Sequence, residues 1–493
     1  MNDRRVQPHL PETSVPSRTS RRTSGRTSRR TVALCAAAVA ALLASPLAAV
    51  APAAAATKAP IADFNGDGYA DLVINAPYAT VAGTANAGYV SVVYGSSAGA
   101  DTAHPQNLSL ATSLIPGEAS ASHNFGMATA ARDLDGDGYS DLVVGGYNKE
   151  SSAILWGSAA GLSKATTLAG AVYDVVGGDF NGDGKGDLAV KSSEGLQIRL
   201  GPFSRSGVPA DTSTLPVDER QETWDIAAGD MNGDGKDDLV TTHGFEERSY
   251  KSRWWPGTST GVSSTYKTTG YYTVGGVIAD VDQDGYGDYV SREVEAVSET
   301  MSYEAGTVRV VYGSSLGPST RTKKITQDTA GVPGAGESAP ITDEQYDGDQ
   351  FGYSLAAGDV TGDGYPDIAV GVPGEDIGSI KDAGSVVLLK GSASGLTGSG
   401  AQAFNQSTSG VPGASETLDH FGASVTLADV NTNNRADLTV SAPTEDGTYQ
   451  NSGAAWVFRG SKAGLTTTNI TSFGPAALGA PEKEAFFGVG FAR

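Results

Sequence analysis

The sequence is nearly free of cysteine and poor in positive charge. Its one cysteine among 493 residues, Cys35, lies in an Ala-rich apolar stretch near the N-terminus, so disulfides cannot stabilise the rest of the chain. Lysine and arginine number 34 against 56 aspartates and glutamates, which gives a formal net charge of −22. Because nucleic-acid binding requires a basic surface, we expect no nucleic-acid partner.

Histidine and long apolar runs are scarce as well. The five histidines form no H-E-x-x-H motif and no paired metal-ligand spacing, so the sequence identifies no catalytic residue. Three G-x-S-x-G matches, at Ser97, Ser259 and Ser315, fall in a turn that recurs along the chain with other residues at the serine position. Hairpin turns explain them better than a catalytic nucleophile does. After residue 56 we find no apolar run long enough to span a membrane.

The first 56 residues differ from the remainder. An Arg/Ser/Thr-rich leader precedes an Ala-dominated apolar segment that ends in small residues, which is typical of a secretory signal peptide at 1–56. Residues 28–34, SRRTVAL, resemble a twin-arginine export signal, with Sec export as the alternative. A membrane anchor is the weaker interpretation, because Pro46 and Pro52 interrupt the apolar run. We therefore expect a secreted, extracellular protein whose mature domain is 57–493.

An acidic nine-residue pattern recurs along the mature chain. Its seven copies, at intervals of 46 to 79 residues, are DFNGDGYAD from Asp63, DLDGDGYSD from Asp133, DFNGDGKGD from Asp179, DMNGDGKDD from Asp230, DVDQDGYGD from Asp280, DVTGDGYPD from Asp359 and DVNTNNRAD from Asp429. Repetition at such a period indicates a solenoid or a propeller.

The copies have the residue types of calcium-binding loops. Oxygen-bearing side chains occupy positions one, three, five and nine, and in six copies a Gly at position six permits a tight turn around one hard cation. An EF-hand would need Glu at position twelve, which no copy has. Polar turns without metal are the alternative, but six intact copies favour about six Ca²⁺ sites. The seventh copy, with Arg435 inside it and only Asp429 and Asp437 as acids, should bind weakly or not at all.

The predicted metal-binding residues stand at positions one, three, five, seven and nine of the loops. They are Asp63, Asn65, Asp67, Tyr69, Asp71, Asp133, Asp135, Asp137, Tyr139, Asp141, Asp179, Asn181, Asp183, Lys185, Asp187, Asp230, Asn232, Asp234, Lys236, Asp238, Asp280, Asp282, Asp284, Tyr286, Asp288, Asp359, Thr361, Asp363, Tyr365, Asp367, Asp429, Asn431, Asn433 and Asp437.

Short β-rich segments surround these loops. A Phe-Gly pair stands eight residues before three of them, and each loop leads into a β-rich run, a variable loop, a further strand and a Gly-Ser turn, so a repeat has four strands. Residues 351–374 (FGYSLAAGDVTGDGYPDIAVGVPG) and 421–443 (FGASVTLADVNTNNRADLTVSAP) resemble the FG-GAP repeats of the integrin α-subunit head. The third to fifth copies resemble the shorter repeats of secreted bacterial FG-GAP proteins. The resemblance implies an all-β fold, a calcium-binding β-propeller of seven four-stranded antiparallel blades.

The last eight residues, FFGVGFAR at 486–493, contain a Phe-Gly pair with no acidic loop after it. The mature N-terminus, conversely, begins with a loop and a second strand and lacks the Phe-Gly strand. We therefore expect the C-terminal strand to complete the first blade, which would leave no unpaired edge between the last blade and the first.

Ligand binding is expected on the face opposite the calcium loops. Successive hairpins place the variable loops between second and third strands there, and variable loops on a rigid scaffold are where binding residues concentrate. In the integrin heads that the chain resembles, partner contacts also cluster on that face. The candidates, each of which could instead be an ordinary solvated loop residue, are Tyr78, Tyr303, Asp376, Asp446 and Tyr449. Trp254 and Trp255 could stack on a sugar, but their third-strand position favours packing within a blade.

These features predict a monomeric, secreted binding or cell-adhesion module for an extracellular protein or glycan. The alternative is a secreted propeller enzyme, a hydrolase or polysaccharide lyase, with its site on the same face, since propellers host both kinds of function. A convergent acid and base on that face would favour the enzyme. A broad patch of tyrosines and acids would favour binding.

Overall fold

The computed structural model describes residues 62–216, 220–297, 301–340 and 347–493. All of them belong to one compact unit, Ala59–Arg493. The signal peptide predicted at 1–56 lies outside the described residues. Within the described ranges, no helix has the length and apolar character needed to cross a membrane.

The described residues are all-β, as the repeats predicted, apart from two short 3₁₀ helices, η1 (Met301–Tyr303) and η2 (Pro475–Leu478). Neighbouring strands in every sheet pair antiparallel. The first sheet contains β1 (Leu72–Ala76), β2 (Tyr89–Tyr94) and β3 (Asp101–Leu108). The second contains β4 (Thr129–Arg132), β5 (Asp141–Val144), β6 (Ala153–Trp156) and β7 (Lys164–Thr167). The third contains β8 (Asp174–Gly178), β9 (Asp187–Ser192), β10 (Gly195–Leu200) and β11 (Asp211–Thr214).

The middle of the chain forms one seven-stranded sheet. Its strands are β12 (Glu222–Gly229), β13 (Asp238–Phe245), β14 (Arg248–Trp255), β17 (Lys267–Ala279), β18 (Asp288–Glu293), β19 (Val308–Val311) and β20 (Thr322–Ile325). A two-stranded ribbon, β15 (Gly257–Thr258) and β16 (Gly261–Val262), lies between β14 and β17 in the sequence. Two four-stranded sheets follow: β21 (Leu355–Gly358), β22 (Asp367–Val372), β23 (Ser385–Leu389) and β24 (Gln402–Phe404), then β25 (Ser424–Ala428), β26 (Asp437–Ala442), β27 (Ala454–Ser461) and β28 (Gly464–Phe473).

The seven-stranded sheet arises because one strand serves two repeats. β17 is 13 residues long; its first part pairs with β14, and its second part, from Thr273, pairs with β18. Gly275 and Gly276 have φ values of 60° and 129°, which suit glycine, and the register with β18 shifts beside them. The sequence predicted two separate sheets here. The structure joins them where TVGGVIA replaces the usual Phe-Gly start of a strand.

Each acidic loop is anchored to the core by a buried apolar residue. Its second residue has no exposed surface in any copy; these residues are Phe64, Leu134, Phe180, Met231, Val281, Val360 and Val430. The phenylalanine of each Phe-Gly pair is also fully buried, at Phe125, Phe351, Phe421 and Phe487. Val360 and Phe421 lie in one core cluster between neighbouring sheets. Since full burial of such a side chain is worth about 1.5 to 3 kcal/mol, the cores between sheets hold the loops in place.

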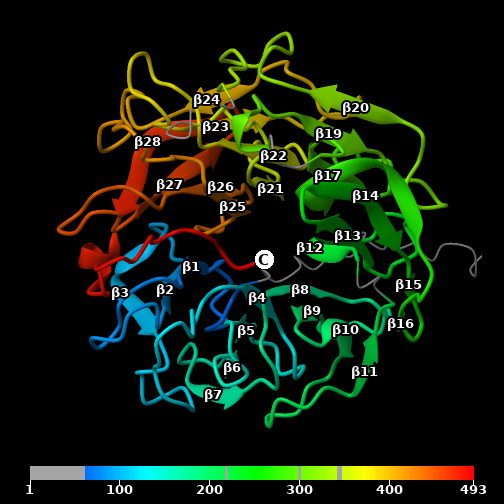
Figure 1. Ribbon diagram of the computed structural model, residues 1–493, viewed down its shortest axis with the longest axis vertical. Helices are drawn as coiled ribbons and strands as arrows, with labels where there is room; N and C mark the ends of the chain where they lie inside the picture. Colours follow the sequence, from blue (N-terminus) through cyan, green and yellow to red (C-terminus); the bar gives the residue numbers. More distant parts are fainter. Residues whose placement is uncertain (1–61, 217–219, 298–300, 341–346) are drawn as a thin grey trace, which may run out of the picture. The chain divides into compact units, whose positions relative to one another are not determined.

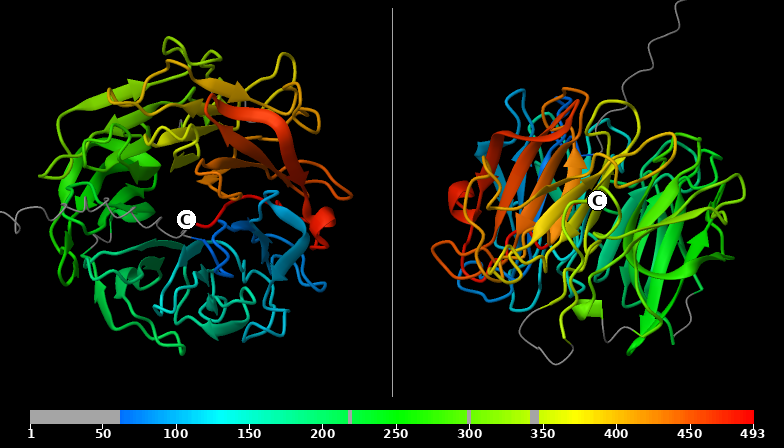
Figure 2. Two further views of the ribbon diagram at one scale, coloured as in Figure 1. Left: turned by 180° about the vertical axis from the view of Figure 1, so that it is seen from behind. Right: turned by 90° about the horizontal axis from the view of Figure 1, so that it is seen from above.

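The sheets of this unit follow one another around a common centre (Figure 1). Neighbouring repeats contact each other through one strand each, because β4 contacts β8, β8 contacts β12, β12 contacts β17, β17 contacts β21 and β21 contacts β25. The C-terminal segment, red in Figures 1 and 2, lies beside β1. Gly488 N donates to Asn75 O at 2.9 Å, Asn75 N donates to Gly490 O at 3.0 Å, and Arg493 N donates to Thr129 O at 3.2 Å. Phe491 forms an isolated antiparallel bridge with Ile74. No sheet closes on itself within the described ranges.

Candidate functional site

The first residue of each acidic loop is oriented by the loop's own backbone. In the first loop, Asp63 Oδ1 accepts hydrogen bonds from Gly66 N at 2.7 Å and Asp67 N at 3.2 Å, and Asp63 Oδ2 accepts one from Gly68 N at 2.9 Å. Position one accepts backbone N–H groups in the same way at Asp133, Asp179, Asp230, Asp280, Asp359 and Asp429. These hydrogen bonds fold each loop into a tight turn around its first aspartate.

Position seven contributes its backbone to this turn. Tyr69 N, for example, donates to Asp67 Oδ1 at 3.0 Å, and the equivalent bonds come from Tyr139, Lys185, Lys236, Tyr286 and Tyr365. The two lysine side chains fold back on position five, with Lys185 Nζ 3.7 Å from Asp183 Oδ2 and Lys236 Nζ 3.3 Å from Asp234 Oδ2. A cation at these two loops would therefore meet a partly neutralised carboxylate.

The aspartate at position nine ties three parts of each repeat together. Asp71 Oδ2 accepts Phe64 N at 2.8 Å, and Asp71 Oδ1 accepts Gly95 N at 3.0 Å at the end of the third-strand segment. The same pair of bonds occurs at Asp141, Asp187, Asp238, Asp288 and Asp367. Position nine was predicted to close the metal site; it also fastens the loop to the turn after the third strand.

These position-nine carboxyls are buried, and burial raises their pKa values. The pKa reaches about 7 for Asp71, Asp141 and Asp288. It reaches about 6 at Asp187, Asp238, Asp367 and Asp437. Burial is the largest cause in each, and the two backbone N–H donors to Asp71 oppose it. A nearby cation would favour the ionised form of such a group.

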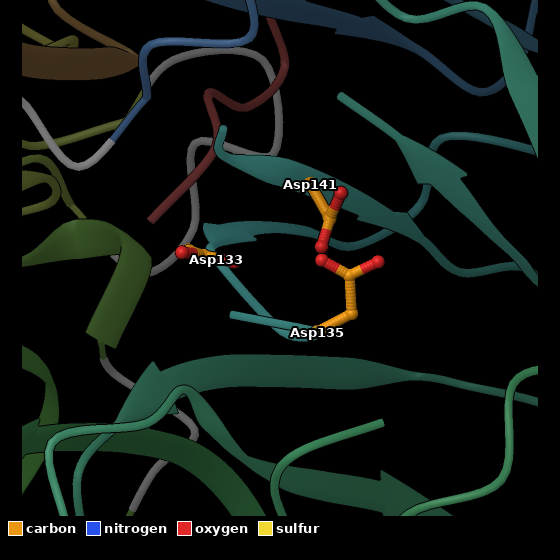
Figure 3. A group of neighbouring side chains, drawn as sticks. All are labelled: Asp133, Asp135 and Asp141. Atoms are coloured by element: carbon orange, nitrogen blue, oxygen red, sulfur yellow. The ribbon is translucent and has the colours of Figure 1, made fainter. Parts of the chain in front are cut away.

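Two of the loops gather three carboxylates. Ligand atoms of Asp133, Asp135 and Asp141 lie within 4.8 Å of one another, and the same holds for Asp280, Asp282 and Asp288. Figure 3 shows Asp135 and Asp141 with their carboxylates turned toward each other. Asp282 Oδ1 is buried without a hydrogen-bond partner. A set of carboxylate oxygens with an orphaned member fits a hard cation such as Ca²⁺. The other loops have Asn or Thr at position three, and no further group of this kind occurs among the described residues.

In each of these two loops, an arginine from another segment forms ion pairs with the aspartates. Arg205 pairs with Asp135 and Asp137, and Arg321 pairs with Asp282. Each guanidinium lies over an aromatic ring, Arg205 at 4.9 Å from the Trp156 centroid and Arg321 at 3.6 Å from that of Tyr312. The arginines balance the extra charge of Asp at position three. Sequence reasoning missed them because both come from the segment between the third and fourth strands, far from the loop motif.

The seventh loop differs in its hydrogen bonds as well as its sequence. Asp437 Oδ2 accepts Asn431 Nδ2 and Arg459 Nη1, in place of a backbone N–H. Arg435 donates to Thr361 O at 3.2 Å in the sixth loop and to Asn433 O at 3.5 Å in its own. Protein donors thus occupy an oxygen that a cation would use, and the weak binding of this copy stays a prediction.

A pocket lies on the opposite face, which we call the loop face: the ends of the sheets that carry the segments 77–88, 145–152, 373–384 and 443–453. It has a volume of about 680 Å³ and is lined by Tyr78, Asn86, Tyr449, Gln450, Asn451, Lys483, Glu484 and Phe486. Tyr78 and Phe486 meet edge to face at 5.9 Å, and Tyr449 is half exposed. Two of the five predicted ligand residues, Tyr78 and Tyr449, therefore line one pocket although 371 positions separate them.

The other three predicted ligand residues lie elsewhere. Asp376 pairs with Lys381 and accepts Asp382 N at 3.1 Å, and Asp446 accepts Asn451 N at 2.8 Å, so both aspartates shape their own loops. Tyr303 ends the η1 turn, and its carbonyl accepts Ala339 N at 3.0 Å. None of the three lines the pocket. The pocket residues Lys483, Glu484 and Phe486 were missed because their approach to segment 77–88 depends on the C-terminal segment packing against β1.

The loop face also carries exposed apolar side chains. Tyr147, Phe245, Val297, Tyr353 and Tyr449, each 37% to 53% exposed, stand at the ends of strands or loops on this face. Trp254 and Trp255, by contrast, are buried and donate to Asp238 Oδ2 and Thr241 Oγ1, both at 2.9 Å. The packing role favoured for the two tryptophans is thus what the structure shows, and neither ring is free to stack on a sugar.

Comparisons with known proteins match the repeats. The family model for the FG-GAP repeat matches residues 56–93, 223–250, 351–389 and 421–458, and the model for the FG-GAP-like repeat matches 133–190. The chain is 29% identical over 165 residues to phosphatidylinositol-glycan-specific phospholipase D of Rattus norvegicus, covering 34% of this chain and 18% of that protein. It is 32% identical over 229 residues to integrin alpha-PS2 of Drosophila melanogaster, covering 41% of this chain and 15% of that protein. The chain thus spans less than a fifth of these relatives.

Two solved structures are similar at low identity. A lectin of Agrocybe aegerita, described as recognising non-reducing terminal N-acetylglucosamine, has a TM-score of 0.46 at 12% identity, over 84% of this chain and 93% of that one. The Dos1 propeller has a TM-score of 0.37 at 10% identity, over 67% and 68%. The matches show that this chain contains FG-GAP repeats, in the same segments as the acidic loops and sheets described above.

Proposed function

We propose that the protein is an extracellular, calcium-binding β-propeller of seven blades that serves as an adhesion or ligand-binding module for a protein or a glycan. The seven blades are the six sheets, with the seven-stranded sheet counted as two blades that share β17. The hydrogen bonds from Gly488 N to Asn75 O and from Asn75 N to Gly490 O support a first blade that the C-terminal segment completes.

Calcium has a structural role in this proposal. The loops lie at one end of the sheets, away from the pocket, and their position-nine aspartates connect loop, second strand and third strand. About six ions would neutralise groups of carboxylates that otherwise repel one another within single turns. The ions would therefore stiffen the scaffold that presents the loop face.

The pocket lined by Tyr78, Tyr449 and Phe486 is the observation that carries the binding function. Aromatic faces beside the amides of Asn86, Gln450 and Asn451 combine apolar contact with hydrogen-bonding groups, as small-ligand and sugar sites do. Similarity to an integrin α chain agrees with an adhesive role.

The pocket favours binding over hydrolysis. Glu484 is the single carboxylate in its lining, and it accepts a hydrogen bond from Thr80 Oγ1 at 3.1 Å. A glycosidase needs two carboxylates on either side of the scissile bond, and this lining offers one. The enzyme therefore remains the second proposal, without an observation that favours it.

A glycan and protein array tests the proposal. Wild-type protein in calcium should bind a restricted set of ligands, and Tyr449→Ala should weaken that binding at least tenfold. Leu316→Ala is the control, because Leu316 is 73% exposed and lies in a turn on the calcium side. Equal binding by wild type and Tyr449→Ala would exclude this pocket as the ligand site.

A further inference from the structure

Two places on the loop face repeat the same four polar side chains. In each place, the segment that precedes a Phe-Gly strand packs against the loop between the second and third strands of the following repeat. The first junction cluster contains Gln327, Glu337, Asp349 and Glu375, and the second contains Gln406, Glu416, Asp419 and Glu445. The surrounding sequences, TQDTAGVPGAGE and NQSTSGVPGASE, place the glutamines five residues before Val-Pro-Gly in both.

The hydrogen bonds of the two clusters correspond one to one. Asp349 Oδ2 accepts Glu337 N at 2.6 Å, and Asp419 Oδ2 accepts Glu416 N at 2.6 Å. The glutamine reaches across the junction in both clusters: Gln406 Nε2 donates to Glu445 Oε2 at 2.6 Å, and Gln327 Nε2 donates to Glu375 Oε2. Two successive repeats therefore build the same arrangement.

The amide oxygens of both glutamines have no hydrogen-bond partner among the residues that the structure describes. Gln327 and Gln406 are 2% and 1% exposed, and Oε1 of each is buried without a donor. Nε2 of each amide donates to a glutamate of its cluster, so Oε1, which is bonded to the same carbon as Nε2, lies near that carboxylate. A buried acceptor without a donor is rare in folded proteins, and it commonly marks the place of a water or an ion.

Among the described residues, no Lys or Arg forms an ion pair with the carboxylates of the two clusters. Within the described part of the chain, Glu416, Asp419, Glu445 and Asp446 form no ion pair with Lys or Arg. Glu416, Asp419 and Asp446 lie close enough to Glu445 to disfavour its ionised form. In the first cluster, Lys381 forms its ion pair with Asp376 and interacts with Glu337 only electrostatically. Asp349 and Asp419 are buried, at 2% and 3% exposure, and a buried carboxylate needs a compensating charge when it is ionised.

We propose that each junction cluster binds one divalent cation of the calcium class, through the glutamine Oε1 and the carboxylates of the neighbouring Asp and Glu. Carboxylate and carboxamide oxygens are the donors that Ca²⁺ takes. The cation would supply the orphaned amide oxygens with a partner and the carboxylates with a countercharge. These two sites are separate from the acidic loops. Their ions would stabilise the loop face, as ions in the acidic loops would stabilise the opposite face.

A third junction in the same chain has the same turn but no glutamine. The segment after β3 has the same turn, in which Ser109 N donates to Thr112 Oγ1 at 3.1 Å as Asn405 N donates to Thr408 Oγ1 at 3.0 Å. Leu110 occupies the glutamine's position there and is 4% exposed in a core cluster. The fold thus accepts leucine at this position, and Gln406→Leu should fold.

Calcium bound per chain, counted by mass spectrometry after equilibrium dialysis, tests the proposal. We expect Gln406→Leu to bind one ion fewer than wild type, and Gln327→Leu/Gln406→Leu to bind two fewer. Glu445→Gln preserves size and should also lose one, so it decides the question if the leucine variant does not fold. Glu118→Gln removes an exposed acid from the junction that lacks the glutamine, and its count should equal that of wild type.

Terbium luminescence excited through tryptophan gives a second readout. A Cβ at Gly413 would lie 3.7 Å from Gln406 Nε2 and 3.8 Å from Trp456 Cζ2, so the indole lies beside the second cluster. Emission should fall in Gln406→Leu and be unchanged in Glu118→Gln. Calcium counts and emission equal to those of wild type in both Gln406→Leu and Glu445→Gln would overturn the proposal, and so would a wild-type count no higher than the number of acidic loops that bind.

Discussion

Removing the side chain of Phe487 should destabilise the protein strongly. Phe487 is fully buried in the core cluster that also contains Ile74, Val457 and Phe473, and its ring meets that of Phe473 at 6.3 Å. A Phe→Ala change at such a site costs about 3 to 5 kcal/mol through lost burial and the cavity left behind. That is a large share of a typical stability of about 5 to 15 kcal/mol.

Deleting residues 486–493 should cost more still. The deletion also removes Phe491 and the two backbone hydrogen bonds to Asn75, whose buried N–H would be left without its partner. Urea unfolding in saturating calcium, followed by far-UV and near-UV circular dichroism, measures both variants. Phe486→Ala is the control, since this neighbour lines the pocket and is partly exposed; it should cost under about 1 kcal/mol. A deletion variant with the wild-type midpoint would refute the completion of the first blade by this segment.

Three further predictions concern the loops and one buried histidine. Excess chelator should lower the melting temperature of the wild type, because each site filled at a hundredfold excess over its Kd adds about 2.7 kcal/mol; an unchanged melting temperature would contradict structural calcium. Arg205→Ala should tighten calcium binding at the second loop by up to about fivefold, since the half-exposed arginine pairs with Asp135 and Asp137; titration calorimetry measures this, with Arg248→Ala as control. Burial lowers the pKa of His243 from 6.5 to about 3, with Arg253 adding to the effect, so the folded state stays neutral while the unfolded state takes up a proton as pH falls. Stability should therefore decrease by about 2 kcal/mol between pH 6.5 and 5, and His243→Phe should flatten that part of the profile; an identical profile in the variant would show that other groups control it.

The repeats and their acidic loops could be predicted because their information is local. Position, residue type and spacing within nine residues define where an aspartate such as Asp63 must turn, and burial of the second residue follows from its apolar character. The all-β fold follows from the same repetition. Local patterns also indicated that Trp254 and Trp255 pack within a sheet, as their burial shows.

Features that depend on contacts between repeats could not be predicted. The pocket needs segment 77–88 beside Phe486, and the arginine at the second loop comes from residue 205, outside any motif. The second role of position nine was hidden too, because Gly95 lies 24 residues from Asp71. The long β17 was unpredictable for a different reason. Glycines usually end a strand, but Gly275 and Gly276 lie inside β17, where they let it pair first with β14 and then with β18.

The shared strand β17 makes two repeats into a single mechanical element. Elsewhere, consecutive sheets are joined by loops, so a local opening can stop at a boundary between repeats. From β12 to β20 the hydrogen-bond ladder is continuous, and pulling β17 away from β18 also loads its pairing with β14. The strand amide hydrogens of β12 to β20 should therefore exchange as one cooperative block, which would make this the stiff part of the molecule and leave motion to the sheets that share no strand.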